Sequence, residues 1–549
     1  MPWTHNYAAL GHSLALTSLA GAIPVFFLFW ALAVKRMPGH LAGGVTFLLT
    51  FADAVLVYKM PVGLALASGL LGMSNGLFPI AWIVVSAVFL YNLVVEAGQF
   101  TIIQSSIASL SDDRRLQALL VAFSFGAFLE GAAGFGTPVA IAGAILIGLG
   151  FEPLYAAGIC LLANTAPVAF GALGSPIIGV AAVTGLDVMA VSQAVGRQLT
   201  LLAVLVPWYL VMIMSGWKAA KEVMPAILVC GISFAVPQYV VANVLGPYLP
   251  NIISSLASLM ATAVFLRFWK PCAVWRFPNE TGVPLQAAGS YSSAQICKAW
   301  SPFALLTAMV GIWGLPAFKN WVAHDLQWFV NIPHWPGLDG LVYKVPPIVT
   351  QPAVYAASYK LDLVATPGTA MFLTSLMAML IFRLKPSQGL AVFGKTLRQL
   401  RYPLFTIVSV LGFAYLANYS GLSYTLGLLF ASAGKVFPLL SPVLGWIGVF
   451  LTGSDLSSNA LFGKLQQVTA QQIGVNPVLT VAANSSGGVV GKMISPQSIA
   501  VAAAATHLVG RESALFRFTF KHSLFFIGLM ALVVLVQAYA VPGLIPSAP

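Results

Sequence analysis

The stretch GAFLEGAAGFGTPVA, residues 126–140, places a single carboxylate, Glu130, inside an apolar segment. The residues that follow it are poor helix formers: Gly131, Gly134, Gly136 and Pro138. Glycine weakens the interior of a helix and proline interrupts it, so the stretch predicts a break in a helix. We interpret it as the tip of a helical hairpin whose end lies inside the protein.

The composition indicates where such a hairpin lies. Of the 549 residues, 59% are hydrophobic and 7% are charged, whereas about a quarter of the residues in a soluble domain are charged. Apolar runs of roughly 20 residues, long enough to cross a bilayer, recur along the chain. The sequence therefore predicts an all-α polytopic membrane protein with about 12–14 membrane segments.

Other classes of function find little support. The net charge of +12 is spread over loops rather than gathered in a basic domain, so we expect no nucleic-acid partner. The four cysteines lack metal-ligand spacing, and no phosphate-binding GxxxxGK[ST] loop is present. We expect no metal, no cofactor and no enzymatic activity.

Continuous helices are expected near 13–34, 40–57, 76–97, 199–216, 223–245, 249–267, 299–317, 362–382, 403–419 and 523–541. The short run 62–73 is expected to be re-entrant or interfacial. The chain then divides into N-terminal scaffold helices (1–118), a first repeat core (119–187), scaffold helices and loops (188–439), a second repeat core (440–509) and a C-terminal helix (510–549). Most lysines and arginines fall in loops on one side of this arrangement, which predicts that the N-terminus lies outside.

The two repeat cores share three short matches in the same order. GAFLEG (126–131) matches GVFLTG (448–453), and LGFEP (149–153) matches IGVNP (473–477). NTAPVAFGALGSP (164–176) matches NSSGGVVGKMISP (484–496). The loop charges place the copies in opposite directions across the bilayer. Such inverted structural repeats, with broken helices and re-entrant hairpins, point to a transporter site near the membrane midplane.

Each repeat carries one carboxylate at nearly the same place, Glu130 and Asp455. A charged group at the bilayer centre costs roughly 2.5–3.5 kcal/mol, so it must be protonated, paired or solvated in a cavity. A proton-coupling role is one interpretation. A structural ion pair with Lys464 or Lys492 is the second, and exposure at the periphery is the third.

The hairpin tips supply candidate substrate ligands. Free backbone N–H groups at a helix N-terminus bind carboxylates. These groups are expected at Gly134, Gly136 and Thr137 in the first copy, and at Ser457, Ser458 and Asn459 in the second. The alternative is that the glycines only allow helices to pack closely.

A second break is expected in each copy, at Asn164-Thr165-Ala166-Pro167 and at Asn484-Ser485-Ser486-Gly487. Amide and hydroxyl side chains there can bind the carboxylate and hydroxyl of a substrate, or satisfy carbonyls freed by the break. Lys492 follows a Gly-Gly pair in the second copy. Its ammonium group is expected to neutralise an anionic substrate, or to pair with Glu130 or Asp455.

Several long blocks resemble the L-lactate permease family, which includes glycolate permeases. They are the stretch 123–177, PIAWIVVSAVFLYNL (79–93), GPYLPNIISSLASL (246–259), LGFAYLANYSG (411–421) and FLTGSDLSSNALFG (450–463). More distantly, the paired broken blocks resemble the ion-transporter superfamily of inverted-repeat hairpin carriers. The first block has Thr137 where the family pattern leads us to expect alanine.

The resemblance implies proton-coupled symport of L-lactate, glycolate and related small 2-hydroxymonocarboxylates across the bacterial inner membrane. It implies a small carboxylate, a proton and the lipid bilayer as partners, and carriers of this kind are often homodimers. The alternatives are a cation/proton antiporter and a carrier of another small organic anion.

Overall fold

The computed structural model describes residues 2–35, 37–108, 110–134, 137–277, 291–326 and 330–546. Within these residues 11 helices are long and apolar enough to cross a membrane, or 12 if one bent helix pair counts as a span. The chain is therefore a multi-pass helical membrane protein, which confirms the class predicted from composition.

The first repeat core begins with a helical arm of α7 (Arg114–Gln117), a π-helical stretch (Ala118–Phe125) and α8 (Gly126–Ala132). The chain turns at Gly134, which has a positive φ of 62°, and returns as α9 (Thr137–Gly148). This is the predicted hairpin. A broken helix follows, made of α10 (Pro153–Ala163) and the stretch Val168–Thr184, which ends in α11 (Gly171–Thr184); its two parts meet at 66°.

The second repeat core repeats this order of elements. Helix α20 (Phe437–Thr452) ends at Gly453, whose φ is 68°, and α21 (Asp455–Gln472) returns from the tip. Helices α22 (Pro477–Lys492) and α23 (Pro496–Ala505) follow. Helix α9 packs on α23 and α21 packs on α11, so each repeat contacts the other through equivalent elements. This exchange is the contact pattern of a pseudo-two-fold pair.

The predicted break at Asn484-Ser485-Ser486 is wrong, because α22 continues through these residues to Lys492. The break instead falls between Lys492 and Pro496, where Ser495 caps α23. A Cβ atom on Gly487 would collide with the Pro442 carbonyl oxygen of α20. The glycines of this stretch therefore allow close packing of α22 on α20.

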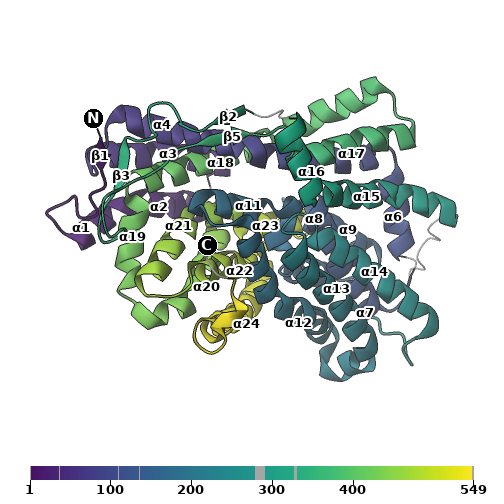
Figure 1. Cartoon of the computed structure of the whole chain (residues 1–549). Coiled ribbons are helices and arrows are strands. Elements are labelled where there is room, and N and C mark those ends of the chain that lie inside the picture. The colour runs from purple at the N-terminus through teal and green to yellow at the C-terminus, as the bar shows by residue number, and fades with distance from the viewer. Residues whose placement is uncertain are drawn as a thin grey trace.

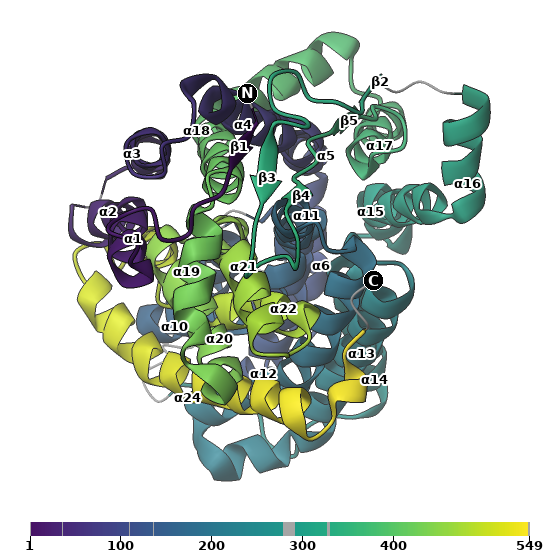
Figure 2. The same cartoon turned by 60° about the vertical axis from the view of Figure 1, so that its left-hand side comes forward.

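Scaffold helices surround the repeats: α11, α21 and α22 occupy the middle of the molecule in two views (Figures 1 and 2). Before the first repeat lie α1 (Leu14–Gly21), α2 (Ile23–Phe29), α3 (Gly39–Leu56), α4 (Val62–Asn75), α5 (Trp82–Glu96) and α6 (Gln99–Ala108). Between the repeats lie α12 (Val188–Glu222), α13 (Met224–Val244), α14 (Pro250–Phe268), α15 (Ser293–Gly314), α16 (Pro316–Trp321), α17 (Pro367–Phe382), α18 (Pro386–Tyr419) and α19 (Leu422–Ala431). Helix α24 (Glu512–Tyr539) ends the fold.

Helix α4 differs from the short re-entrant or interfacial element expected at 62–73. It leads through a kink at Phe78 into α5, and the helical stretch Val62–Glu96 is 35 residues long. The apolar window of this stretch is 78% buried. The element is thus part of a long span packed against α18, rather than a segment at the interface.

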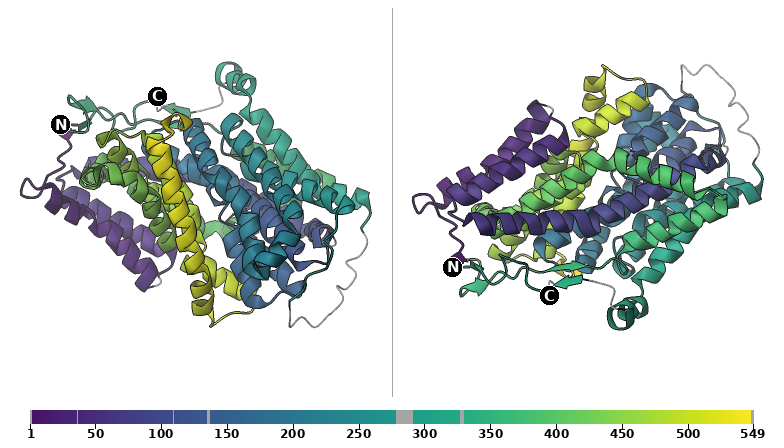
Figure 3. Two further views of the ribbon diagram at one scale, coloured as in Figure 1. Left: turned by 90° about the horizontal axis from the view of Figure 1, so that it is seen from below. Right: turned by 90° about the horizontal axis from the view of Figure 1, so that it is seen from above.

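Short strands, which hydrophobicity did not predict, cover one face of the helices. They are β1 (Trp3–Thr4), β2 (Val330–Ile332), β3 (Val342–Lys344), β4 (Ala353–Val354) and β5 (Tyr359–Leu361). Strand β3 pairs with β1 in parallel and with β4 in antiparallel, and β2 pairs with β5. Figure 3 shows the strands and the end of α24 at the same edge of the molecule, which we call the strand face.

The base of the first hairpin is fixed by a buried guanidinium group. Arg115 is fully buried and bonds to Asp113 at 2.6 Å and to Glu222 at 2.8 Å. It also donates to the backbone oxygens of Ala219 and Ala273, both at 2.9 Å. Because these groups belong to α12 and to the segment after α14, the hairpin base is tied to the scaffold while its tip lies among the repeats.

We expect the substitution Gly487→Ala to lower the free energy of unfolding by about 1–3 kcal/mol, because the added methyl group overpacks the α20–α22 contact. The thermal midpoint of the detergent-solubilised protein measures this effect. Gly528→Ala in α24 is the matched control, since nothing lies within 4 Å of a Cβ built there. Equal midpoints for the two variants would contradict the packing role of Gly487.

Candidate functional site

The two hairpin tips and the first helix break line one small cavity of about 50 Å³, which we call the central cavity. Glu130 and Gly134 come from the first hairpin, and Gly453 and Asp455 come from the second. The break in the first repeat contributes a wall that includes Gly171, Ala172, Ser175 and Pro176. A space of this size holds about three or four water molecules, so a ligand that fits it is small.

One ion pair joins the two repeats across this cavity. The Nζ atom of Lys492 lies 3.4 Å from Oε1 of Glu130, and their side chains are 10% and 3% exposed. Asn164 donates from Nδ2 to the other carboxylate oxygen of Glu130 at 3.0 Å. Removing either partner of a buried pair leaves an uncompensated charge, so the pair holds the repeats in register.

Asp455 lies at the start of α21 and has no basic partner within salt-bridge distance among the described residues. Its Oδ2 atom accepts from the Ser485 hydroxyl at 2.5 Å and from Asn459 Nδ2 at 3.3 Å. Its Oδ1 atom is buried and has no hydrogen-bond partner in the part of the chain that the structure describes. The second carboxylate is thus held by neutral donors and keeps one oxygen available.

Two glycines make room for these carboxylates. A Cβ atom on Gly171 would lie 2.5 Å from Oε1 of Glu130. A Cβ atom on Gly488 of α22 would collide with Oδ1 of Asp455. Any larger residue at either position would displace the carboxylate that it faces, so the Gly-Gly pair before Lys492 serves both packing and the site.

Helix N-termini add positive potential to the same place. Helix α21 begins at the cavity, and its N-cap residue Ser454 accepts from the Ser457 amide at 3.3 Å. Helix α11 regains regular geometry at Ser175, after positive φ values at Ala172, Leu173 and Gly174. Because the N-terminal end of a helix favours negative charge, these two ends together with Lys492 form a setting for an anion.

The central cavity opens toward the face opposite the strands. An adjoining cavity of about 410 Å³ shares Gly453, Ser454 and Lys492 with it and is also lined by His40 and Tyr402. His40 lies at the start of α3, and α3 runs about 27 Å from there to the strand face. A solute can therefore reach Lys492 from the side away from the strands.

A protein-family model described as L-lactate permease matches residues 17–541 of this chain. The L-lactate permease of Bacillus subtilis (strain 168) is 52% identical to it over 100% of both chains. The chain belongs to the L-lactate permease family. Glycolate permease GlcA of Escherichia coli (strain K12) is 51% identical and aligns over 99% of this chain and 100% of its own. Among solved structures, Neisseria gonorrhoeae MtrF shares 13% identity and a TM-score of 0.48 over 88% of this chain and 85% of its own.

This member of the L-lactate permease family brings most of the predicted site residues together. Asn459 is the centre of the network, since its amide nitrogen lies 3.2 Å from the Pro176 carbonyl oxygen and 3.3 Å from the Ser485 hydroxyl. Asn484 donates to Asn459 Oδ1 at 2.9 Å. The group formed around the central cavity consists of Glu130, Gly134, Asn164, Asp455, Ser457, Asn459, Asn484, Ser485 and Lys492.

Other predicted residues lie elsewhere. Ser458 bonds to the Gly445 carbonyl of α20, and Ser486 bonds to Gln198 of α12 at 2.5 Å, so neither side chain faces the cavity. Thr165 is buried beside Asn164, with its hydroxyl oxygen unpaired among the described residues. Gly136 lies outside the described residues, and Thr137 is described only as the first residue of α9.

Sequence reasoning missed Ser454 and Gly171 of the site. Ser454 could have been found, because a serine directly before an acidic first turn is the pattern of a helix N-cap. Gly171 carries no local signal, since its importance depends on the distance to Glu130 in the folded chain.

We expect Glu130 and Lys492 to be energetically coupled by about 1–3 kcal/mol, as residues in direct contact are. A double-mutant cycle of Glu130→Gln and Lys492→Met, read from unfolding in detergent, measures this term. Lys395 and Glu96, 3.7 Å apart and 73% and 49% exposed, form the control cycle, which is expected to give less than about 1 kcal/mol. Additive effects at Glu130 and Lys492 would show that the pair does not hold the repeats together.

Proposed function

We propose that this chain is a secondary active transporter that moves L-lactate, glycolate and related 2-hydroxymonocarboxylates together with protons. One observation carries the proposal. Two carboxylates meet at one small cavity. Among the described residues Glu130 has a basic partner there, Lys492, whereas Asp455 has none and keeps an unpaired oxygen. Full-length similarity to permeases named for lactate and for glycolate supports the substrate class.

In this proposal the substrate carboxylate binds at Lys492 and at the N-terminus of α21. Ammonium groups and free backbone N–H groups are the donors that a carboxylate prefers. The backbone of Gly134 and of Thr137, the first residue of α9, completes the anion site from the first hairpin. Asn164 keeps Glu130 in place, so that Lys492 can exchange between its protein partner and the substrate.

We assign the proton to Asp455. A lone anion entering against an inside-negative potential is opposed by about 2.3 kcal/mol per 100 mV. One proton carried with each anion makes the step electrically neutral, and the proton gradient then drives uptake. Asp455 suits this role because its Oδ1 atom can take up a proton without breaking the bonds from Ser485 and Asn459 to Oδ2.

In this proposal the protein lies in the bacterial inner membrane, with the N-terminus and the strand face outside. The central cavity then opens to the cytoplasm, a state from which substrate is released. The repeat cores 119–187 and 440–509 bind substrate, and the remaining segments form the scaffold. A homodimer is the assembly that we propose for this scaffold.

A cation/proton antiporter would also use buried carboxylates. It gains nothing from Lys492, however, whose ammonium group would repel a cation at the same cavity. The permease proposal uses all three charged groups of the site, so it is the one we retain.

We expect purified protein in liposomes to accumulate labelled L-lactate and glycolate when the interior is made alkaline, and only to equilibrate them without a gradient. Lactamide, the neutral amide of lactate, is the matched control and should not compete. Accumulation that ignores the proton gradient would rule out symport, and failure to take up either acid would rule out the substrate class.

We expect Asp455→Asn to abolish gradient-driven accumulation while exchange of lactate across the membrane persists, because the anion site stays intact. Lys492→Met should lose both activities. Asp362→Asn, which removes a carboxylate outside the site, should behave as wild type. If Glu130→Gln rather than Asp455→Asn uncouples transport in this way, Glu130 carries the proton.

A further inference from the structure

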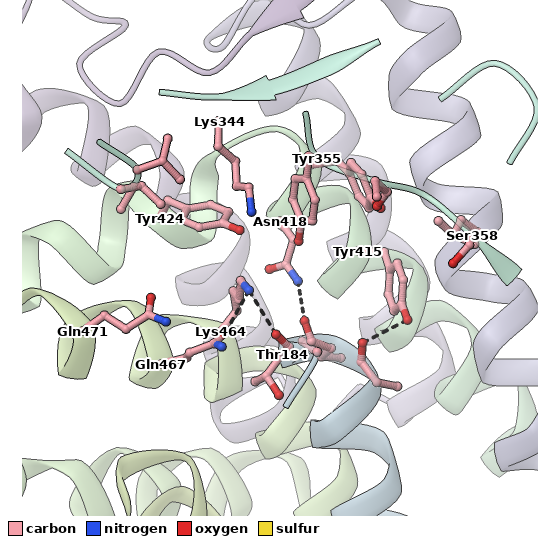
Figure 4. Close-up of a pocket in the computed structure, with 18 residues that line it drawn as sticks. Thr184, Lys344, Tyr355, Ser358, Tyr415, Asn418, Tyr424, Lys464, Gln467 and Gln471 are labelled. Carbon is pink, nitrogen blue, oxygen red and sulfur yellow. Dashed lines mark hydrogen bonds between the residues drawn. The ribbon is translucent and has the colours of Figure 1, made fainter. Parts of the chain in front are cut away.

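A second polar cavity lies on the strand face, apart from the central cavity. Its volume is about 530 Å³, and it is lined by the ends of α11, α18, α19 and α21 and by the segment 344–358. Figure 4 shows Lys344, Tyr355, Asn418, Tyr424 and Lys464 around this space, which we call the strand-side cavity. It shares no described lining residue with the central cavity.

Two ammonium groups face each other in the strand-side cavity. Lys464 reaches it from α21 and Lys344 from β3, and their Nζ atoms point toward one another (Figure 4). Lys464 is only 9% exposed and donates to the Thr184 carbonyl at 3.1 Å and to Gln467 at 2.8 Å. None of the described residues that line the cavity is acidic.

The surroundings of the two lysines add partial negative charge but no full counter-charge. The Nζ atom of Lys464 lies 5.4 Å from the ring centre of Tyr424, and that of Lys344 lies 4.9 Å from the ring centre of Tyr355. Burial also lowers the pKa of nearby His5 to about 4, and repulsion from Lys344 and Lys464 contributes to this shift. Burial also lowers the pKa of Lys344, so an anion bound between the two lysines would stabilise their charged forms.

We propose that the strand-side cavity is a second binding site for a small carboxylate, held between Lys344 and Lys464. The substrate class rests on the proposed function, but the site itself rests on these two charges and the absence of an acid among the described lining residues. Its volume exceeds that of the central cavity about tenfold. The anion therefore binds there with water, and more loosely than between the hairpin tips.

The position of the site gives it a role in substrate entry. Helix α21 carries Asp455 at one end and Lys464 nine residues later, which corresponds to about 13 Å along the helix. The strand-side site thus collects anions beside the second half of the helix that leads to the central cavity. Clefts lined by one sign of charge raise the local concentration of an oppositely charged solute.

The test is equilibrium binding of radiolabelled L-lactate to the purified full-length protein in detergent. We expect two lactates per chain, and we expect Lys344→Gln or Lys464→Gln to weaken one of them at least about tenfold, the value of a lost charge-assisted bond. Lys344 lies on a surface strand, so its replacement spares the membrane helices. Lys360→Gln is the matched control. Lys360 lies on strand β5 of the same strand face, but it pairs with Asp362 and does not line the cavity.

Two further measurements distinguish lactate binding at this site from binding at the central cavity and from binding of inorganic anions. In Lys492→Met one lactate should remain, and its affinity should still depend on Lys344. A single lactate in the wild type, unaffected by Lys344→Gln, would overturn the proposal, and so would displacement by chloride at the same concentration as lactate. Failure of proton-driven uptake in liposomes would instead overturn the proposed function, so the two failures are distinguishable.

Discussion

Peptide groups left open by a break in a helix cannot face lipid, because the hydrocarbon core offers them no hydrogen-bond partner. Both hairpin tips, at Gly134 and Gly453, and the bend after Ala163 are subject to this constraint. The fold meets it by turning all three toward one central cavity inside the protein. The packing of α9 on α23 and of α21 on α11 follows, since each repeat covers the open backbone of the other.

Burial of the site also determines how its charged side chains are stabilised. Glu130 and Lys492 come from different repeats, so their pairing neutralises two buried charges only when the repeats are correctly assembled. Asp455 is stabilised by hydroxyl and amide donors and lacks a salt-bridge partner among the described residues, which leaves its charge adjustable. Gly171 and Gly488 are needed because both carboxylates lie where a side chain would otherwise be. Close packing and chemistry therefore depend on the same small residues.

Much of this arrangement is readable from sequence, since helix-breaking residues beside a carboxylate in an apolar run have few physical explanations. The class and the hairpins follow from such local signals, whereas the pairing of Glu130 with Lys492 was one of several alternatives that they left open. The predicted break at Asn484 was wrong because glycine also allows close helix packing. Whether these glycines break or pack the helix depends on its contact with α20, which local sequence does not show. Ser458 and Ser486 were misplaced for the related reason that a continuous helix turns them toward α20 and α12.

Hydrogen bonds between α21 and α11 lie beside both cavities. Asn459 donates to the Pro176 carbonyl near the central cavity, and Lys464 donates to the Thr184 carbonyl near the strand face. A solute that passes between the cavities must break these two hydrogen bonds or move together with the helices that they join. The same Asn459 amide also contacts Asp455, so a change of charge on Asp455 would alter a bond that joins the two repeats. The carboxylate and the contact between the repeats are thus linked through one side chain, as the proposed coupling of a proton to a conformational change requires.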